Sequence, residues 1–122
     1  MFYTELDGGP SSIRRATRAS TTDPWTDLGR VAELSVSAAV GWPSLSSDGL
    51  ELYLEDAAAG SIDVATRPAV GATFTTPTQV AQLSIGIDSD PELSRDGTTM
   101  FFASSSASTM GDDLFVATRT CN

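Results

Sequence analysis

The stretch Trp42-Pro43-Ser44-Leu45-Ser46-Ser47-Asp48-Gly49-Leu50-Glu51-Leu52-Tyr53-Leu54 decides how this chain folds. It returns 48 residues later as Asp90-Pro91-Glu92-Leu93-Ser94-Arg95-Asp96-Gly97-Thr98-Thr99-Met100-Phe101-Phe102. Each copy has a short strand pattern, an Asp-Gly pair and a second run of apolar and aromatic residues. Asp-Gly between two such runs predicts a hairpin, because glycine adopts the positive φ that the turn needs. Two copies at this period indicate a repeat architecture.

A second repeated feature is the tripeptide Ala-Thr-Arg, which ends a strand pattern three times, at 16–18, 65–67 and 117–119. Residues 1–5 align with the strands that follow the two Asp-Gly turns. The alternation over 29–34, and its counterpart ending at Leu83, predicts a short fourth strand at a sheet edge. The sequence therefore predicts an all-β chain of ten strands, grouped three, four and three, with no convincing helix.

These groups divide the chain into three units. Residues 1–40 form a unit without its first strand, 41–88 a complete unit, and 89–122 a unit without its last strand. Four-stranded antiparallel units at this period are typical of propeller blades, which pack their faces on their neighbours.

The repeated motif carries a family likeness. Pro-x-Leu-Ser-x-Asp-Gly at 43–49 and 91–97, followed by Ile62-Asp63-Val64 and Leu114-Phe115-Val116, resembles the TolB-type, WD-like β-propeller repeat. The resemblance implies a propeller fold, usually of six or more blades. It also implies a protein-binding platform, often in the bacterial envelope or outside the cell, although related propellers form parts of enzymes.

The chain departs from that family because it holds only about two and a half blades. Met1 falls in mid-blade, which suggests a fragment or an internal start within a longer propeller gene. A lone arc of blades would expose apolar faces and strand edges. We therefore expect a homo-oligomer that closes a ring, with a dimer favoured over other arrangements.

Composition excludes several classes of function. The 122 residues suit a single domain, the net charge is −9, and the seven cations are all Arg. An acidic chain without a basic run argues against nucleic acid and anionic membranes as partners. No leader and no long apolar run is present, so we expect no membrane insertion; cellular location stays open.

The absence of His removes catalytic triads and His-ligated zinc. Any metal would be held by oxygen, which favours Ca²⁺, Mg²⁺ or Mn²⁺. The single cysteine, Cys121, cannot form a disulfide within the chain and is interpreted as a thiol of the tail.

Asp88, Asp90 and Glu92 are the candidate metal ligands. They alternate along a strand, so period-two geometry predicts that all three point the same way. In a propeller this strand is innermost, and the carboxylates would line the central channel, where a cation could activate water. The competing interpretation, which we favour because fold alone does not imply function, makes Asp88 and Asp90 solvated or turn-forming residues ahead of Pro91 and Glu92 a polar channel residue. The second copy does not repeat the acids, which weakens the metal hypothesis.

Trp42 occupies the place of Asp90 in the other copy, at the channel mouth. It could stack on a ligand or pack on a neighbouring blade, and both alternatives stay open. With Trp25 it could instead bind carbohydrate.

Other polar residues have structural interpretations. Arg18, Arg67 and Arg119 recur at one position and are expected to stack or pair within a blade, or to cross a subunit interface. Glu51, Glu55 and Asp56 are expected on a solvent face. The serines of the loop 104–111 lack a neighbouring base, so no nucleophile is predicted.

Two functions follow from these residues. The first is a non-enzymatic scaffold or binding module, with a protein or small-molecule ligand in the channel. The alternative is a weak divalent-metal hydrolase, acting on activated esters or phosphoesters through Asp88, Asp90 and Glu92.

Overall fold

A computed structural model describes residues 1–6, 8–105 and 111–120. Its elements, in chain order, are β1 (Phe2–Glu5), β2 (Ser12–Thr17), β3 (Thr26–Arg30), the 3₁₀ helix η1 (Ala32–Leu34), β4 (Val40–Leu45), β5 (Glu51–Asp56), β6 (Ser61–Thr66), β7 (Thr78–Gln79), the 3₁₀ helix η2 (Ala81–Leu83), β8 (Ile87–Leu93), β9 (Thr99–Ser105) and β10 (Asp113–Thr118). Within these ranges the ten predicted strands are confirmed. No helix in the described part of the chain is long and apolar enough to cross a membrane.

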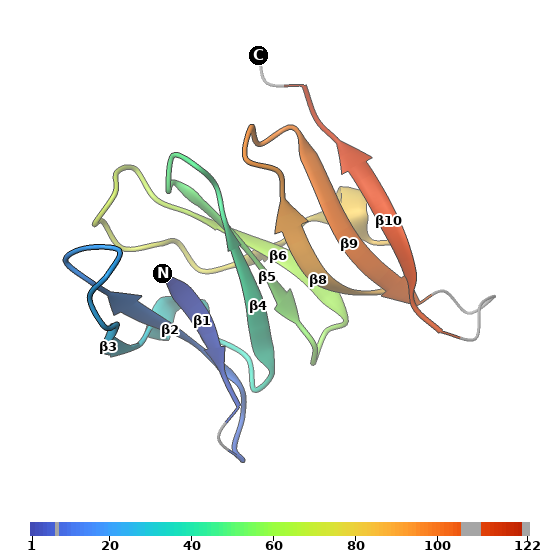
Figure 1. The fold of residues 1–122 in the computed structure, drawn as a ribbon. Helices are drawn as coiled ribbons and strands as arrows, with labels where there is room; N and C mark the ends of the chain where they lie inside the picture. The colour runs from blue at the N-terminus through green and yellow to red at the C-terminus, as the bar shows by residue number, and fades with distance from the viewer. Residues whose placement is uncertain (7, 106–110, 121–122) are drawn as a thin grey trace.

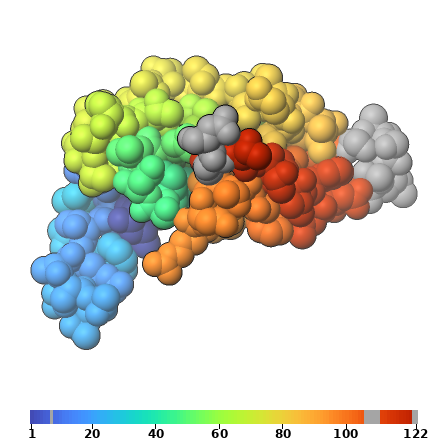
Figure 2. Space-filling view, turned by 90° about the horizontal axis from the view of Figure 1, so that it is seen from above, coloured from blue at the N-terminus to red at the C-terminus, as the bar shows by residue number. Residues whose placement is uncertain are grey.

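The strands form three separate antiparallel sheets (Figure 1). The first sheet is β1-β2-β3, the second is β4-β5-β6-β7, and the third is β8-β9-β10. Seen from above, the sheets follow one another along an open arc, with the yellow connection after β6 along one rim (Figure 2). The all-β architecture predicted from the repeats is therefore present, as an array that does not close on itself.

The two repeated Asp-Gly pairs form equivalent turns. Gly49 and Gly97 have φ of +75° and +71°, a region that costs a residue with a Cβ. Asp48 accepts hydrogen bonds from the Ser46 hydroxyl at 2.7 Å and the Leu50 amide at 2.9 Å. Asp96 is held in the same way in the third sheet. The interpretation of these residues as turn formers is confirmed.

The recurring arginine fastens each of these turns to the third strand of its sheet. Arg67 Nε donates to the Gly49 carbonyl at 2.7 Å, and Arg119 Nε donates to the Gly97 carbonyl at the same distance. Arg67 also lies over the Phe74 ring, 4.4 Å from its centroid, as Arg18 lies over Trp25 at 4.3 Å. The expected stacking within one unit is confirmed for Arg18 and Arg67. The Arg119 guanidinium reaches the second sheet, where it pairs with Glu51 at 2.7 Å.

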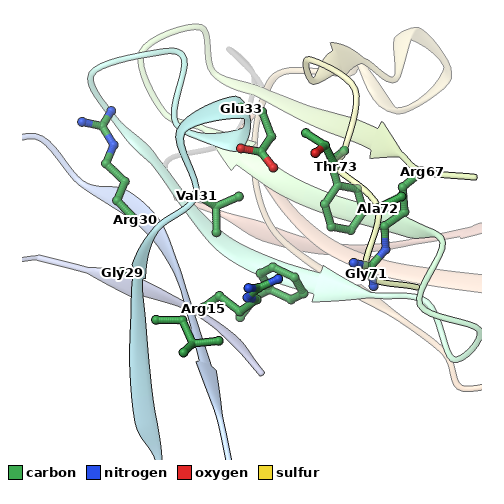
Figure 3. A pocket seen from close by; sticks show the side chains of 12 residues that line it. Arg15, Gly29, Arg30, Val31, Glu33, Arg67, Gly71, Ala72 and Thr73 are labelled. Carbon is green, nitrogen blue, oxygen red and sulfur yellow. The ribbon is translucent and has the colours of Figure 1, made fainter. Parts of the chain in front are cut away.

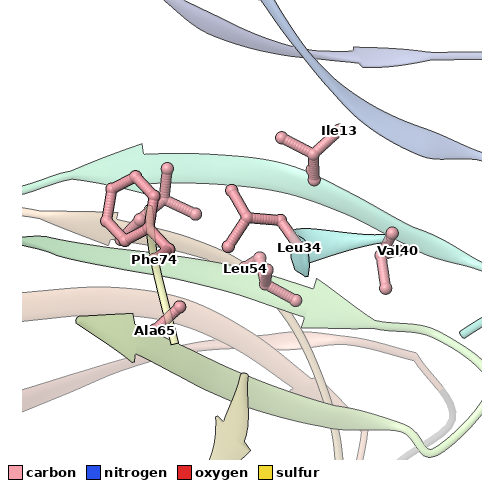
Figure 4. Close-up of a cluster of buried hydrophobic side chains, with 7 residues drawn as sticks. Ile13, Leu34, Val40, Leu54, Ala65 and Phe74 are labelled. Atoms are coloured by element: carbon pink, nitrogen blue, oxygen red, sulfur yellow. The ribbon is translucent and has the colours of Figure 1, made fainter. Parts of the chain in front are cut away.

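The second sheet is buried on both faces. Leu52 and Leu54 pack toward the first sheet in a cluster with Ile13, Leu34, Val40, Ala65 and Phe74 (Figure 4). Tyr53 and Ile62 point the other way and pack with Leu93, Met100 and Phe102 of the third sheet. Because successive side chains of a strand alternate between faces, one strand serves both cores.

The last strand of the first unit and that of the second, β3 and β7, both end earlier than the sequence predicts. β3 ends at Arg30 and β7 has only two residues, and each is followed by a 3₁₀ turn. These turns place Leu34 and Leu83 in the two cores, at 0% and 8% exposure. In a strand, successive side chains would alternate between the two faces of the sheet. The 3₁₀ turn instead directs one leucine side chain into the core at the sheet edge.

The core between the first two sheets generates a stability prediction. Leu54→Ala should lower the free energy of unfolding by about 2–5 kcal/mol, because it leaves a cavity at a fully buried position. Urea denaturation measures this loss. The matched control is Val70→Ala, at 71% exposure, which should change stability by less than about 0.5 kcal/mol. Equal effects of the two substitutions would contradict the packing described.

Candidate functional site

The first strands of the second and third sheets, β4 and β8, each carry a β-bulge at a residue followed by proline. In β4, Trp42 and Pro43 together stand opposite Leu54, and in β8, Asp90 and Pro91 stand opposite Phe102. Trp42 and Asp90 have φ of +49° and +52°, the positive-φ residues other than glycine in the described chain. Two residues opposite one is the pattern of a bulge, which often re-aims a side chain.

Both bulged residues are held by hydrogen bonds that their amides donate to side chains of the preceding sheet. The Trp42 amide donates to Thr4 Oγ1 at 2.7 Å, and the Asp90 amide donates to Glu55 Oε2 at 3.3 Å. Thr4 and Glu55 occupy corresponding positions, since β1 pairs Thr4 with Ile13 and β5 pairs Glu55 with Ile62. The repeated bond therefore satisfies an amide that the bulge removes from its own ladder.

The two bulges and the first strand enclose an open groove of about 350 Å³. We call it the inner groove; it is lined by Phe2, Thr4, Trp42, Pro43, Asp90, Pro91 and Glu92. Trp42 is 43% exposed, and the Asp90 and Glu92 residues are also exposed. The structure thus brings together three of the residues singled out in the sequence, an aromatic face and two carboxylates.

Asp88 lies elsewhere, and the prediction that Asp88, Asp90 and Glu92 all point one way is wrong. Asp88 pairs with Ser104 and Glu92 pairs with Phe101, and these two partners sit on opposite faces of β9. The extra residue of the bulge shifts the alternation, so period two does not hold across it. Asp88 is only 1% exposed, between the second and third sheets.

The geometry does not bring the three candidate metal ligands together, and Asp88, with 1% exposure, is not the solvated residue of the favoured interpretation either. Within the described ranges, no group of three or more His, Cys, Asp or Glu side chains is placed to hold a metal ion. Among the same residues, neither Asp88 carboxylate oxygen has a hydrogen-bond partner, and the Ser104 hydroxyl opposite has none either. The buried Asp88 is therefore a costly polar group in the core, and it is separated from the inner groove.

Trp25, the other candidate ligand residue, is not part of the inner groove. It is 44% exposed at the start of β3 and packs against the Arg18 guanidinium. The structure therefore gives the two tryptophans different surroundings and does not join them in one site.

The prediction of a solvent face is wrong for Glu55. Its residue is only 9% exposed, and its carboxylate accepts the hydrogen bond from the Asp90 amide. Burial raises the pKa of its carboxyl, the hydrogen bond from the Asp90 amide opposes this rise, and the charges of Asp90 and Asp112 add to it. Only packing of the third sheet on the second buries Glu55, so no local pattern could have indicated it.

A second pocket, of about 310 Å³, opens between the first and second sheets (Figure 3). Arg15, Glu33 and Arg67 stand around it (Figure 3). A related pocket of about 420 Å³ lies between the second and third sheets, where Gln82 and Arg119 take the places of Glu33 and Arg67. The recurrence indicates a gap left by the packing of successive repeats.

Two further sequence expectations fall outside the described residues. Most of the serine-rich loop, residues 106–110, lies there, and so does Cys121.

The buried carboxyl of Glu55 generates a pH prediction. Its pKa in the folded chain is raised, so its contribution to stability is fully present below the unfolded pKa, about 4.3, and is lost as pH rises through the folded pKa. Glu55→Gln still offers an oxygen to the Asp90 amide but carries no charge. The stability of this variant relative to the wild type should therefore increase as pH rises above about 4.3, in urea denaturation at stepped pH.

Asp96→Asn is the control, and its stability relative to the wild type should change with pH in the opposite direction. Hydrogen bonds from Ser94 and Thr98 lower the pKa of Asp96, so its contribution to stability is present above the unfolded pKa and is lost as pH falls. A pH-independent difference for Glu55→Gln would contradict the burial of this carboxyl.

No family model, curated protein or solved structure significantly matches this chain. Its function is therefore inferred from the geometry of its own residues.

Proposed function

We propose that this chain is a non-enzymatic, β-propeller-type binding module that joins further copies of itself to close a ring. In this proposal each sheet is a blade, and the inner groove, which faces the ring axis, is the binding surface. The resemblance of the Asp-Gly repeats to TolB-type propellers supports the same architecture.

The observation that carries the proposal is an open apolar face on the third sheet. In the second sheet, Tyr53 and Ile62 are 7% and 1% exposed because the third sheet covers them. Their counterparts by strand register, Phe101 and Leu114, are 41% and 74% exposed, and Val116 beside them is 57% exposed. The same repeat position is thus a core position in one sheet and a surface position in the next.

A second copy of the chain is the occupant that this face fits best. The chain already contains the required contact, since its third sheet covers the corresponding face of its second sheet. At the other end of the arc, the first sheet presents Tyr3 and Arg14, and Arg14 is already paired with Glu5 at 2.9 Å and with Asp27. The Arg14 guanidinium is thus fully paired, and with its two carboxylates it forms a cluster of net charge −1 at this end of the arc.

Head-to-tail contacts of this kind generate a ring when the rotation closes. Two copies of a three-sheet chain supply six sheets, a normal propeller size, whereas three copies supply nine, above the usual range of about four to eight. A dimer is therefore the proposed assembly.

The alternative function, a metal hydrolase at the axis, has less support. It requires Asp88 beside Asp90 and Glu92, and the bulge in β8 puts Asp88 on the buried face. No observation at the inner groove favours hydrolysis over binding.

Val116→Glu tests the assembly. A carboxylate at this position would be buried without a partner on association, which costs about 3 kcal/mol or more and corresponds to roughly a hundredfold weaker association. We expect the wild type to sediment as a dimer and the variant as a folded monomer.

Val70→Glu is the matched control, because Val70 is 71% exposed but lies outside the open face. It should sediment as the wild type does. A wild type that remains a soluble monomer at all accessible concentrations would refute ring closure by self-association.

A further inference from the structure

We propose that the inner groove binds an organic cation, an alkylammonium group that lies on the Trp42 ring and is neutralised by Asp90 and Glu92. This inference deepens the binding role proposed above and rests on it. The groove is lined by residues of a single chain, so its chemistry does not depend on ring closure.

The first argument is uncompensated negative charge. The ion pairs formed among the described residues are Arg14 with Glu5 and Asp27, and Arg119 with Glu51. None of them involves Asp90 or Glu92, and no Arg lines the inner groove. Glu55 lies directly behind Asp90 and contributes negative charge when ionised. A cationic ligand complements this surface, and an anionic one is repelled.

The second argument is the aromatic and apolar remainder of the lining. Trp42, at 43% exposure, lines the groove together with the partly exposed Pro43 and the buried Pro91, and none of the three carries a side-chain oxygen. A hard metal ion needs a nearly complete shell of oxygen ligands, which these residues do not offer. An alkylammonium ion uses both features, because its methyl groups contact apolar walls and its charge is attracted to the indole face.

The third argument is preorganisation. The Trp42 and Asp90 backbones are fixed by the two bulges and by the hydrogen bonds from their amides to Thr4 and Glu55. Phe2, which also lines the groove, is held by an edge-on contact with Phe74 at 5.7 Å. A ligand therefore has little backbone to order when it binds.

Carbohydrate binding through two tryptophans fits less well, because Trp25 is engaged by Arg18 and does not line the groove. A single tryptophan beside two carboxylates favours a cation over a neutral sugar.

Choline is the probe for this test, and its neutral isostere, in which carbon replaces the quaternary nitrogen, is the comparison ligand. Binding is followed through the two tryptophan indole resonances in NMR titrations. We expect saturable binding of choline that shifts the Trp42 resonance, weakens as salt is raised, and exceeds binding of the isostere by roughly tenfold.

Matched variants assign the binding to the groove. Trp42→Leu should weaken choline binding by roughly tenfold, whereas Trp25→Leu, at nearly the same exposure (44% against 43%), should leave it unchanged. Asp90→Asn should weaken binding and flatten its salt dependence, and Asn tolerates the positive φ of this position. Asp23→Asn removes an exposed charge outside the groove and is its control. Glu92→Gln gives an independent measurement if a bulge variant fails to fold.

Three results would overturn the proposal: no saturable binding of choline, equal binding of the isostere, or equal losses from Trp25→Leu and Trp42→Leu. Repeating the titration with Val116→Glu separates this inference from ring closure. Undiminished choline binding to a monomeric variant would support the cation site independently of ring closure. A wild-type dimer that does not bind choline would refute the cation site and leave the proposed assembly standing.

Discussion

The central strand of the second sheet, β5, buries side chains on both of its faces, and the arrangement of the other sheets depends on this. Leu52 and Leu54 need cover on one side, and Tyr53 needs cover on the other. An isolated sheet of this composition would expose at least one apolar face to water. The first and third sheets supply that cover, so the three sheets stack as a continuous series and the arc is a direct consequence of where the apolar residues lie.

The same stacking positions the inner groove. The strand β4 lies beside β1 of the first sheet, and β8 lies beside β5 of the second. The amide of the bulged residue donates to Thr4 in the first case and to Glu55 in the second. Two bulges in equivalent places turn two different side chains, Trp42 and Asp90, toward the same space. The backbone of the bulge is thus the same in both repeats, and the side chain of the residue before the proline determines which groups line the groove.

Much of the fold could be predicted because turns and strand ends are marked locally. Asp48-Gly49 and the Ala-Thr-Arg tripeptides delimit strands by their own conformational preferences. The candidate site was predicted less well. Period-two reasoning assumes an unbroken ladder, and Pro91, which cannot donate a ladder hydrogen bond, was the local sign of the bulge that separates Asp88 from Glu92. The burial of Glu55 and the inward turn of Leu34 depend on contacts between sheets, which no short window of sequence contains.

The bonds from Arg67 and Arg119 to the carbonyls of the Asp-Gly turns have a consequence for how such a chain can change in length. Arg67 reaches a glycine 18 residues earlier, and Arg119 reaches one 22 residues earlier, so each fastening lies inside its own repeat. A gene duplication that copies one repeat copies the whole fastening with it. When whole repeats are gained or lost, each remaining hairpin therefore keeps the hydrogen bond between its arginine and its turn. The number of repeats is thus easier to alter than the structure of any one repeat.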